Sequence, residues 1–333
     1  MKRIKNIILI ILVLLIVGCK KNNPLYTKKD DNIYFGYYPK SLVSNNELIK
    51  KLNRKINGTP TLENNNGWES YNYYLNDEKN NYMFYKDIDF GNSKYRGIYL
   101  LKYRPKNISY DSNIYDSYQD DNGYDLNNIY WFKYEKIKWD ILKENNDEIT
   151  LITSEIIDSQ NYANTNIDEL YLDEENTKYA NNYELSFVRC WINNDFYNLA
   201  FSDLEKSIIL EKEIDNSGVS FKMDNSSNNT FDKVTLLSYD EAYSYYSSSS
   251  DHYYCTGENK TVGTDYAFSQ GLYLSTTSYS NYRLRTPSAD KGNCSYYVDY
   301  DGAVHGEGIT SFCYVGDTSF GIRPVITIKI DNK

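Results

Sequence analysis

The chain has 333 residues and a formal net charge of −10, with 46 acidic residues against 36 basic ones. This length accommodates one large domain or two small ones. The acidic balance excludes a protein that binds nucleic acid through a basic surface, and it argues against broad electrostatic adhesion to anionic lipid.

The first residues have the features of a secretory leader. Three cations, Lys2, Arg3 and Lys5, precede an unbroken apolar run over residues 7–17. Such a run is shorter than the roughly 20 residues that span a bilayer, but it suits the core of a signal peptide. We therefore interpret residues 1–18 as a signal peptide.

The apolar run ends at Ile16-Val17-Gly18-Cys19, which resembles the lipobox of bacterial lipoproteins. The resemblance implies cleavage after Gly18 and a diacylglycerol and palmitate on Cys19, and acyl chains in this number hold a protein stably on a membrane. An ordinary signal peptide or a short anchor that contains a cysteine is the alternative. We expect the protein on the extracytoplasmic face of the cell membrane, as a cell-envelope lipoprotein.

Residues 19–32 are polar and unpatterned, which is typical of a tether. Residues 33–330 are predicted to form one globular domain. Because cleavage removes three cations, the net charge of the mature chain falls from −10 to −13.

The first half of this domain contains strand and helix patterns in alternation. Residues 33–36 predict a strand, and Ser44 with Glu47 three residues later predicts the start of a helix. Residues 83–90 and 95–103 predict a hairpin. Further strands are expected at 130–132, 137–142 and 149–153.

The middle of the chain predicts short helices. Residues 184–200 have the helical spacing of apolar residues, in two pieces, and Trp191 and Trp139 lie on apolar faces that indicate core positions. Ser202 with Glu205, and Ser238 with Glu241, have the spacing of capping boxes.

The last hundred residues are rich in strand patterns, at 282–286, 296–300, 303–305 and 323–330. Asp301-Gly302 is typical of a type I′ hairpin turn between two of them. The whole pattern predicts an α+β domain of mostly antiparallel strands with short helices, and it disfavours a doubly wound sheet.

Four cysteines remain after Cys19, namely Cys190, Cys255, Cys294 and Cys313. Disulfides are allowed outside the cytoplasm, and four cysteines have three pairings. Cys294 and Cys313 flank the predicted hairpin, so this pair is our first choice, with free buried cysteines as the alternative.

Several blocks in order resemble a bacterial domain of unknown function, number 6273 in that series, which occurs in surface lipoproteins of low-GC Gram-positive bacteria. The blocks run from Ile33 to Pro39, Tyr130 to Leu142, Ser186 to Glu205, Asp232 to Ala242, Leu284 to Pro287 and Gly321 to Val325. The family pattern has two aromatic residues before the Leu-Arg block, where this chain has Tyr282 and Arg283.

The closing blocks are also similar, more distantly, to the C-type-lectin fold, a group that includes the formylglycine-generating enzymes. This second resemblance implies that the first and last strands pair, joining residues 33–36 with 325–330. It implies no activity, because one fold supports many functions. The close cysteine pair that those enzymes use has no counterpart here.

Arg285 and Arg323 are expected to clamp loops together, because a buried guanidinium requires partners. The functional alternative is a ligand face around Tyr282, Arg283, Arg285, Asp299 and Arg323, which would bind an anionic or polar group.

The sequence offers no catalytic residue, no metal site and no cofactor motif. It has two histidines, His252 and His305, without metal-ligand spacing. Three hypotheses follow. The favoured one is a lectin-like binding module for a glycan, peptide or protein partner, and the others are an extracellular hydrolase that uses carboxylates and a purely structural envelope lipoprotein.

Overall fold

The computed structural model describes residues 25–71, 83–107, 117–163, 180–218, 227–246, 259–288, 292–305 and 314–330. Within these ranges the strands are β1 (Thr27–Lys29), β2 (Asn32–Leu42), β3 (Glu69–Ser70), β4 (Met83–Phe90), β5 (Ser93–Leu100), β6 (Ile129–Glu144), β7 (Glu148–Thr153), β8 (Asp158–Ser159), β9 (Ile209–Leu210), β10 (Lys212–Ile214), β11 (Thr230–Asp232), β12 (Val234–Thr235), β13 (Tyr282–Pro287), β14 (Ser295–Val298), β15 (Val304–His305), β16 (Gly321–Ile322) and β17 (Val325–Lys329). The helices are α2 (Asn46–Asn53), α3 (Tyr118–Asp121), α5 (Phe187–Trp191), the π-helix η2 (Ile192–Phe196), α6 (Tyr197–Ala200), α7 (Asp203–Lys206), α8 (Tyr239–Tyr246) and α9 (Asp265–Ser269). Short helices around mostly antiparallel strands confirm the predicted α+β class.

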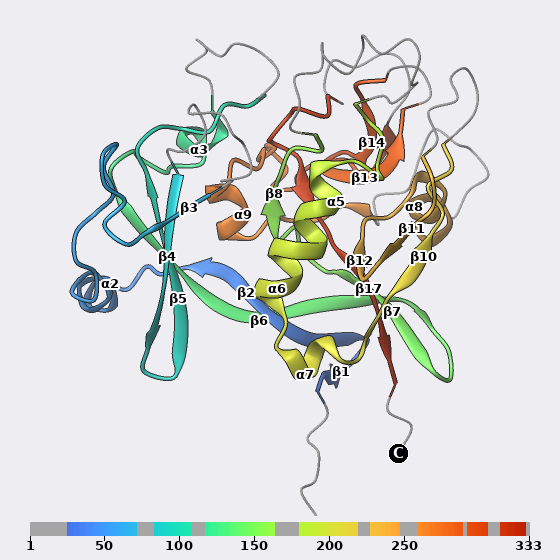
Figure 1. The fold of residues 1–333 in the computed structure, drawn as a ribbon, viewed down its shortest axis with the longest axis horizontal. Coiled ribbons are helices and arrows are strands. Elements are labelled where there is room, and N and C mark those ends of the chain that lie inside the picture. The colour runs from blue at the N-terminus through green and yellow to red at the C-terminus, as the bar shows by residue number, and fades with distance from the viewer. Residues whose placement is uncertain are drawn as a thin grey trace, which may run out of the picture.

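The largest sheet is built around β6. Its strand order is β12-β17-β7-β6-β5-β4-β3, with β2 also paired to β6, β1 paired to β2, and β9 paired to β17. The sixteen residues of β6 pair with β5 near their start, with β2 over their middle and with β7 near their end. In Figure 1, β6 therefore connects the β3–β5 part of the molecule with the β7–β17 part.

Two predictions about this sheet are wrong. Residues 130–132 and 137–142 belong to one long strand rather than two, because Trp131, Ile137 and Trp139 are all buried along β6. The first and last strands do not pair directly. β2 pairs with β6, whereas β17 pairs with β7, so the long strand β6 and its hairpin partner β7 lie between them.

A second sheet has the order β15-β14-β13-β16-β8. The predicted turn at Asp301-Gly302 joins β14 to β15, and Gly302 has a φ of 84° that a residue with a side chain rarely adopts. The Asp299 N–H donates to the Ala303 carbonyl at 2.9 Å and closes the turn. The hairpin is therefore confirmed, but its predicted type I′ turn is wrong, because that turn needs a positive φ at both central residues and Asp301 does not have one.

Helix starts follow the local capping chemistry. At α7, Ser202 and Glu205 form the predicted capping box, and Ser238 and Glu241 exchange the same two hydrogen bonds before α8. The start of α2 differs from the prediction by one residue. Asn45, not Ser44, accepts from the Leu48 N–H at 2.9 Å, since either side chain is a good cap.

The main hydrophobic core joins early and late segments of the chain. Phe35, Trp139, Phe196 and Ile326 belong to one cluster of buried side chains. Trp139 is fully buried and its indole N–H donates to the Phe35 carbonyl at 2.8 Å. The core prediction for Trp139 is confirmed, and the helix of residues 187–200 is held against this cluster.

Candidate functional site

One continuous helical segment, formed by α5, η2 and α6, presents side chains in two directions. It begins at Ser186, whose hydroxyl accepts from the Arg189 N–H at 3.2 Å. Residues 189 and 193 follow one face, while Trp191 projects to the other side by helical geometry. The first face anchors the segment and the second borders a cleft.

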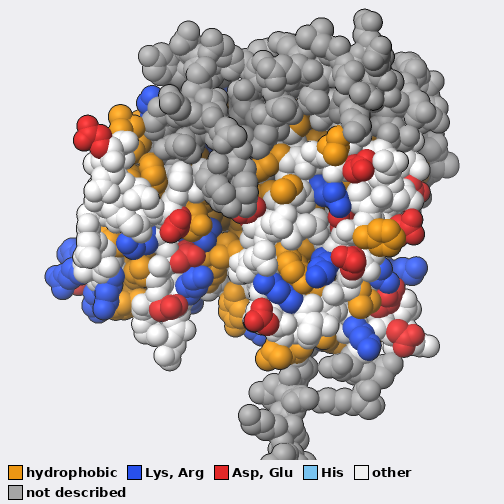
Figure 2. All heavy atoms as spheres, viewed as in Figure 1, with side chains coloured by type: hydrophobic (Ala, Val, Ile, Leu, Met, Phe, Trp, Pro, Cys, Tyr) orange, Lys and Arg blue, Asp and Glu red, His pale blue; other side chains and the backbone are white. Residues whose placement is uncertain are grey.

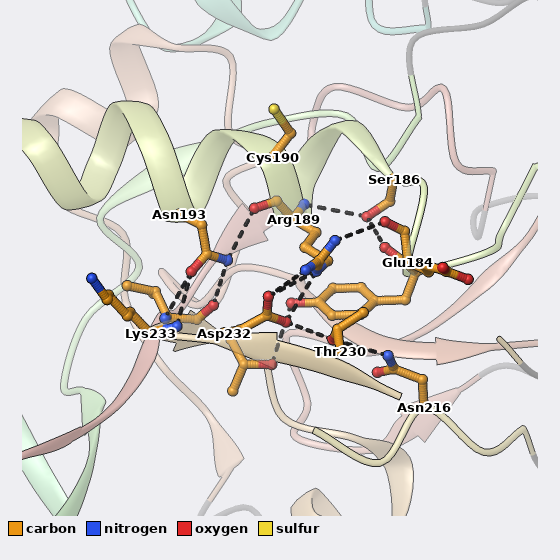
Figure 3. Close-up of polar contacts among 12 residues, drawn as sticks. Glu184, Ser186, Arg189, Cys190, Asn193, Asn216, Thr230, Asp232 and Lys233 are labelled. Atoms are coloured by element: carbon orange, nitrogen blue, oxygen red, sulfur yellow. Dashed lines mark hydrogen bonds and ion pairs between the residues drawn. The ribbon is translucent and has the colours of Figure 1, made fainter. Parts of the chain in front are cut away.

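The anchoring face is tied to β11 and β12 by polar contacts (Figure 3). Arg189 Nε donates to Asp232 Oδ1 at 2.8 Å, and the Asp232 side chain is almost fully buried. Asn193 accepts from the Lys233 and Val234 N–H groups at 3.1 and 3.0 Å and donates to the Val234 carbonyl at 2.8 Å. The Asn193 side-chain amide therefore forms hydrogen bonds with the backbone at β12, as a neighbouring strand would. Together with the Arg189–Asp232 pair, these contacts hold the helical segment against β11 and β12.

The cleft has an empty volume of about 600 Å³, including its opening to solvent. It lies where the β3–β5 part of the large sheet meets the helical segment, and Figure 2 shows hydrophobic side chains along this junction with charged ones beside them. Its lining is aromatic and polar in similar measure: Tyr38, Ser70, Tyr71, Tyr85, Arg96, Asp158, Gln160, Trp191, Asp195, Leu199 and Tyr266. These residues come from segments that are far apart in the chain.

Asp158 is a buried carboxyl group in this cleft. Its Oδ2 accepts from Tyr38 Oη at 2.6 Å, and its Oδ1 accepts from the Ser159 N–H at 2.7 Å and from Gln160 Nε2 at 3.1 Å. Burial raises its pKa to about 6, although these hydrogen bonds and nearby Arg104 act in the opposite direction. Asp158 is thus poised to change charge near neutral pH.

Arg96 forms the other charged element of the lining. Its Nε and Nη2 each donate to Asp87 at 2.8 Å, so the guanidinium is neutralised by a bidentate pair. The guanidinium carbon lies 4.1 Å from the centre of the Tyr85 ring. Nη1 of Arg96 contacts Tyr266 Oη at 3.3 Å, and Tyr266 Oη contacts Tyr71 Oη at 2.8 Å.

The π-helix η2 carries Asp195 into the lining. A π turn bonds residue i to i+5 and is rare outside single turns inserted in α-helices, where it often marks a functional site. Trp191 precedes η2, Leu199 follows it, and all three residues line the cleft. Trp191 is 7% exposed, so it belongs to the core as predicted and also forms part of the cleft wall.

The predicted ligand face is not assembled as one open surface. Arg283 is fully buried, donates to Ser295 Oγ at 3.1 Å and to the Tyr314 carbonyl, and lies over the Phe320 ring. Arg285 instead pairs with Glu241 and donates to the Leu236 carbonyl at 2.7 Å.

The remaining residues of that face have other partners. Arg323 Nη2 donates to the Thr153 carbonyl at 2.8 Å, and its guanidinium carbon lies 4.9 Å from the centre of the buried Tyr282 ring. Asp299 accepts from the Ala303 N–H and lies 2.7 Å from His305 Nε2. Partial burial opposes ionisation of Asp299, but these hydrogen bonds lower its pKa below the usual value. Ligand binding by this set stays a prediction.

Cys190 is a free, exposed thiol that points away from the contacts in Figure 3. Cys294 is disulfide-bonded and pairs through its backbone with Tyr314, the residue after Cys313. Cys313 and Cys255 lie outside the described residues, so the predicted Cys294–Cys313 pairing stays a prediction. Cys19 also lies outside them, as do His252 and residues 1–18, the predicted signal peptide.

Within the described ranges, no group of three His, Cys, Asp or Glu side chains is placed to hold a metal ion. None of the helices in those ranges has the length and apolar character to cross a membrane.

Sequence patterns did not single out the cleft, but four of its residues lie within the blocks that carried the family resemblance. Tyr38 belongs to the first block, and Trp191, Asp195 and Leu199 belong to the third. Arg96 and Asp158 lie outside every block. Because these two residues are far apart in sequence and belong to different strands, β5 and β8, no local spacing could have placed both in one cleft.

The comparisons with known proteins agree with the resemblance. The family model described as Domain of unknown function (DUF6273) matches residues 147–330. No curated protein and no solved structure matches the chain. The cleft is therefore built jointly by residues inside the matched region, such as Asp158, and residues before it, such as Arg96. Since the match covers more than half of the 333 residues, the chain belongs to the family of the domain of unknown function DUF6273.

Proposed function

We propose that this protein is an extracytoplasmic lipoprotein, tethered through a lipid on Cys19, whose lectin-like domain binds a glycan in the cleft. The observation that carries the proposal is the convergence of five aromatic side chains and two carboxylates on one hollow from distant segments of the chain. Binding sites typically combine apolar walls with a few convergent polar groups.

A glycan matches this combination of groups. A sugar ring has an apolar face of C–H groups that packs on aromatic rings, and hydroxyl groups that donate to carboxylates or accept from tyrosine hydroxyls. Tyr71 and Tyr85 stand with ring centres 4.8 Å apart on one side of the cleft lining, and Asp158 supplies the acceptor. The antiparallel sheets and the closing sequence blocks support the lectin-like part of the proposal.

Glycan binding is tested by probing the mature chain against an array of glycans and cell-wall fragments. Tyr85→Ala should abolish the signal for the bound glycan because it removes a half-buried wall of the cleft. Tyr130→Ala is the matched control, since Tyr130 packs edge-to-face against Tyr124 with ring centres 5.0 Å apart outside the cleft. Equal loss in both variants, or no bound glycan, would contradict the proposal.

The tether is tested separately. The wild-type chain should incorporate labelled palmitate and sediment with membranes, whereas Cys19→Ala should lose the label and leave the membrane fraction, because no acyl chain remains to be buried in lipid. Retention of the unlabelled variant in membranes would contradict lipid anchoring at this residue.

A hydrolase is the second candidate, and one observation favours it. Asp158 has a pKa of about 6 in a cleft that also contains Asp195, and a protonated acid beside a second carboxylate is the pair that glycosidases use. Release of new reducing ends from a bound glycan, lost in Asp158→Asn, would establish hydrolysis. Binding of the glycan without release of reducing ends would support the non-enzymatic binding module instead.

A further inference from the structure

The hydrogen-bond direction along the Arg96–Tyr266–Tyr71 chain can be derived from its chemistry. Arg96 only donates, so Tyr266 Oη accepts from it. The 2.8 Å contact between Tyr266 Oη and Tyr71 Oη admits either hydroxyl as donor, but Tyr266 is fully buried, and among the described residues its proton has an acceptor only when it goes to Tyr71 Oη. The Tyr71 proton is then directed away from Tyr266, and Tyr71 becomes a donor available at the cleft.

Asp158, in contrast to Tyr71, is a hydrogen-bond acceptor at the cleft. Each of its hydrogen bonds comes from a donor, namely Tyr38, the Ser159 N–H and Gln160. The nearby cation Arg104 acts on it through Gln160, whose Oε1 accepts from Arg104 Nη2 at 3.2 Å while its amide donates to Asp158. Oδ2 has a single partner, so a lone pair remains for a ligand N–H or O–H.

The walls add a third requirement. Trp191 and Leu199 stand on the same helical segment and line the cleft with apolar surface. A ligand that satisfies all three features carries a donor, an acceptor and a small apolar group close together. An acetamido group has this composition, with its N–H, its carbonyl and its methyl group. A free amine lacks the acceptor and the methyl group.

We infer that the cleft recognises the 2-acetamido group of an N-acetylated hexosamine within a glycan. Asp158 accepts from the amide N–H, Tyr71 donates to the carbonyl, and the Trp191 side chain packs against the methyl group. This inference rests on the proposed glycan-binding function and specifies its substrate class.

Three tetrasaccharides that differ at one position test the inference by calorimetry with the mature chain. They are the β-1,4 tetramers of N-acetylglucosamine, of glucosamine and of glucose. The acetylated tetramer should bind at least about tenfold more tightly than the others, because a site built around donor and acceptor groups rejects ligands that leave them unpaired.

Tyr71→Phe should reduce the preference for the acetylated tetramer over the glucose tetramer, a ratio that a general folding defect would not change. Tyr124→Phe is the matched control, since Tyr124 is also buried and its hydroxyl donates to the Asp265 carbonyl at 2.8 Å outside the cleft. Its ratio should equal that of the wild type.

Equal affinity for the acetylated and glucose tetramers would overturn the acetamido assignment and leave the glycan-binding proposal standing. Failure of all three tetramers to bind would also overturn it, and the glycan array would then decide the broader proposal. An unchanged ratio in Tyr71→Phe would remove Tyr71 from the site.

Discussion

Buried arginines connect neighbouring segments of this domain. Five of them, Arg96, Arg104, Arg283, Arg285 and Arg323, are at most 5% exposed, and each donates to carbonyls or carboxylates from other segments. Burial lowers the pKa of Arg104 and of Arg283 to about 10, which leaves both charged at neutral pH. Losing a partner would leave an uncompensated buried charge, so these contacts specify how the segments fit together.

Asp158 makes the stability of the fold depend on pH. Its pKa is about 6 in the folded protein against 3.8 for a free side chain, so the folded state holds this proton more tightly. The stabilisation of the fold by protonated Asp158 is fully present below pH 4 and is lost as pH rises through 6. A shift of this size corresponds to about 3 kcal/mol.

We therefore expect the wild type to lose up to about 3 kcal/mol of unfolding free energy relative to Asp158→Asn between pH 4 and pH 8. Urea unfolding of both proteins across this range measures the difference. Asp31→Asn, at an exposed carboxylate, controls for the loss of one acid. A wild-type-to-variant difference that stays constant with pH would contradict the shifted pKa.

Among the elements, the short strand β16 shows how closely backbone segments approach. Gly321 pairs with Tyr282 of β13 on one side and with Ser159 of β8 on the other. A Cβ atom at this position would lie 2.4 Å from Ile156 Cγ2, and Ile156 is fully buried. Glycine is required here by space, because no left-handed backbone conformation is involved.

Gly321→Ala should destabilise the domain by about 2 kcal/mol, since overpacking forces the surrounding side chains and backbone to shift. Ile156→Ala removes the atoms that collide, so the double variant should be more stable than the sum of the two single effects predicts. Urea denaturation of the four proteins gives this coupling energy. Strict additivity would show that the two positions do not collide.

Local chemistry explains which elements were predictable. The Ser202 capping box and the Asp301-Gly302 hairpin depend on residues within five positions of each other. The capping box formed as predicted, and the hairpin formed with another turn type than predicted. Asn193 was recognised only as part of a sequence block. Its role in binding β12 depends on Lys233 and Val234, forty and forty-one residues away, which no local pattern encodes.

At the scale of the whole molecule, the region that matches the family model does not contain the whole core. The match begins at residue 147, next to β7, yet β7 pairs with β6 and the core cluster includes Phe35, Phe132 and Trp139. The cleft likewise needs Tyr71 and Arg96 from the earlier part. The fold and the site therefore both depend on segments from either side of this boundary.

A fragment of residues 147–333 should consequently fail to fold. Without β6 the strand β7 loses one neighbour, and apolar side chains of Leu151 and Ile326 lose the partners that cover them. Thermal unfolding followed by circular dichroism should show no cooperative transition for the fragment and a sharp one for residues 25–333. A cooperative transition in the fragment would show that the earlier segments are dispensable.

The sequence alone determined the α+β class, the family and the positions of hairpins and helix caps. Each of these depends on residue patterns within short windows or on ordered sequence blocks. The expected leader and the lipid on Cys19 are also read from such a pattern and await experiment. Only the tertiary structure decided that β6 separates the first and last strands and that the candidate arginines are held within the domain. It also placed Tyr71, Arg96, Asp158 and Trp191 around one cleft. Those outcomes depend on pairing and burial between segments that are separated in the sequence, and such contacts are chosen by the packing of the whole chain.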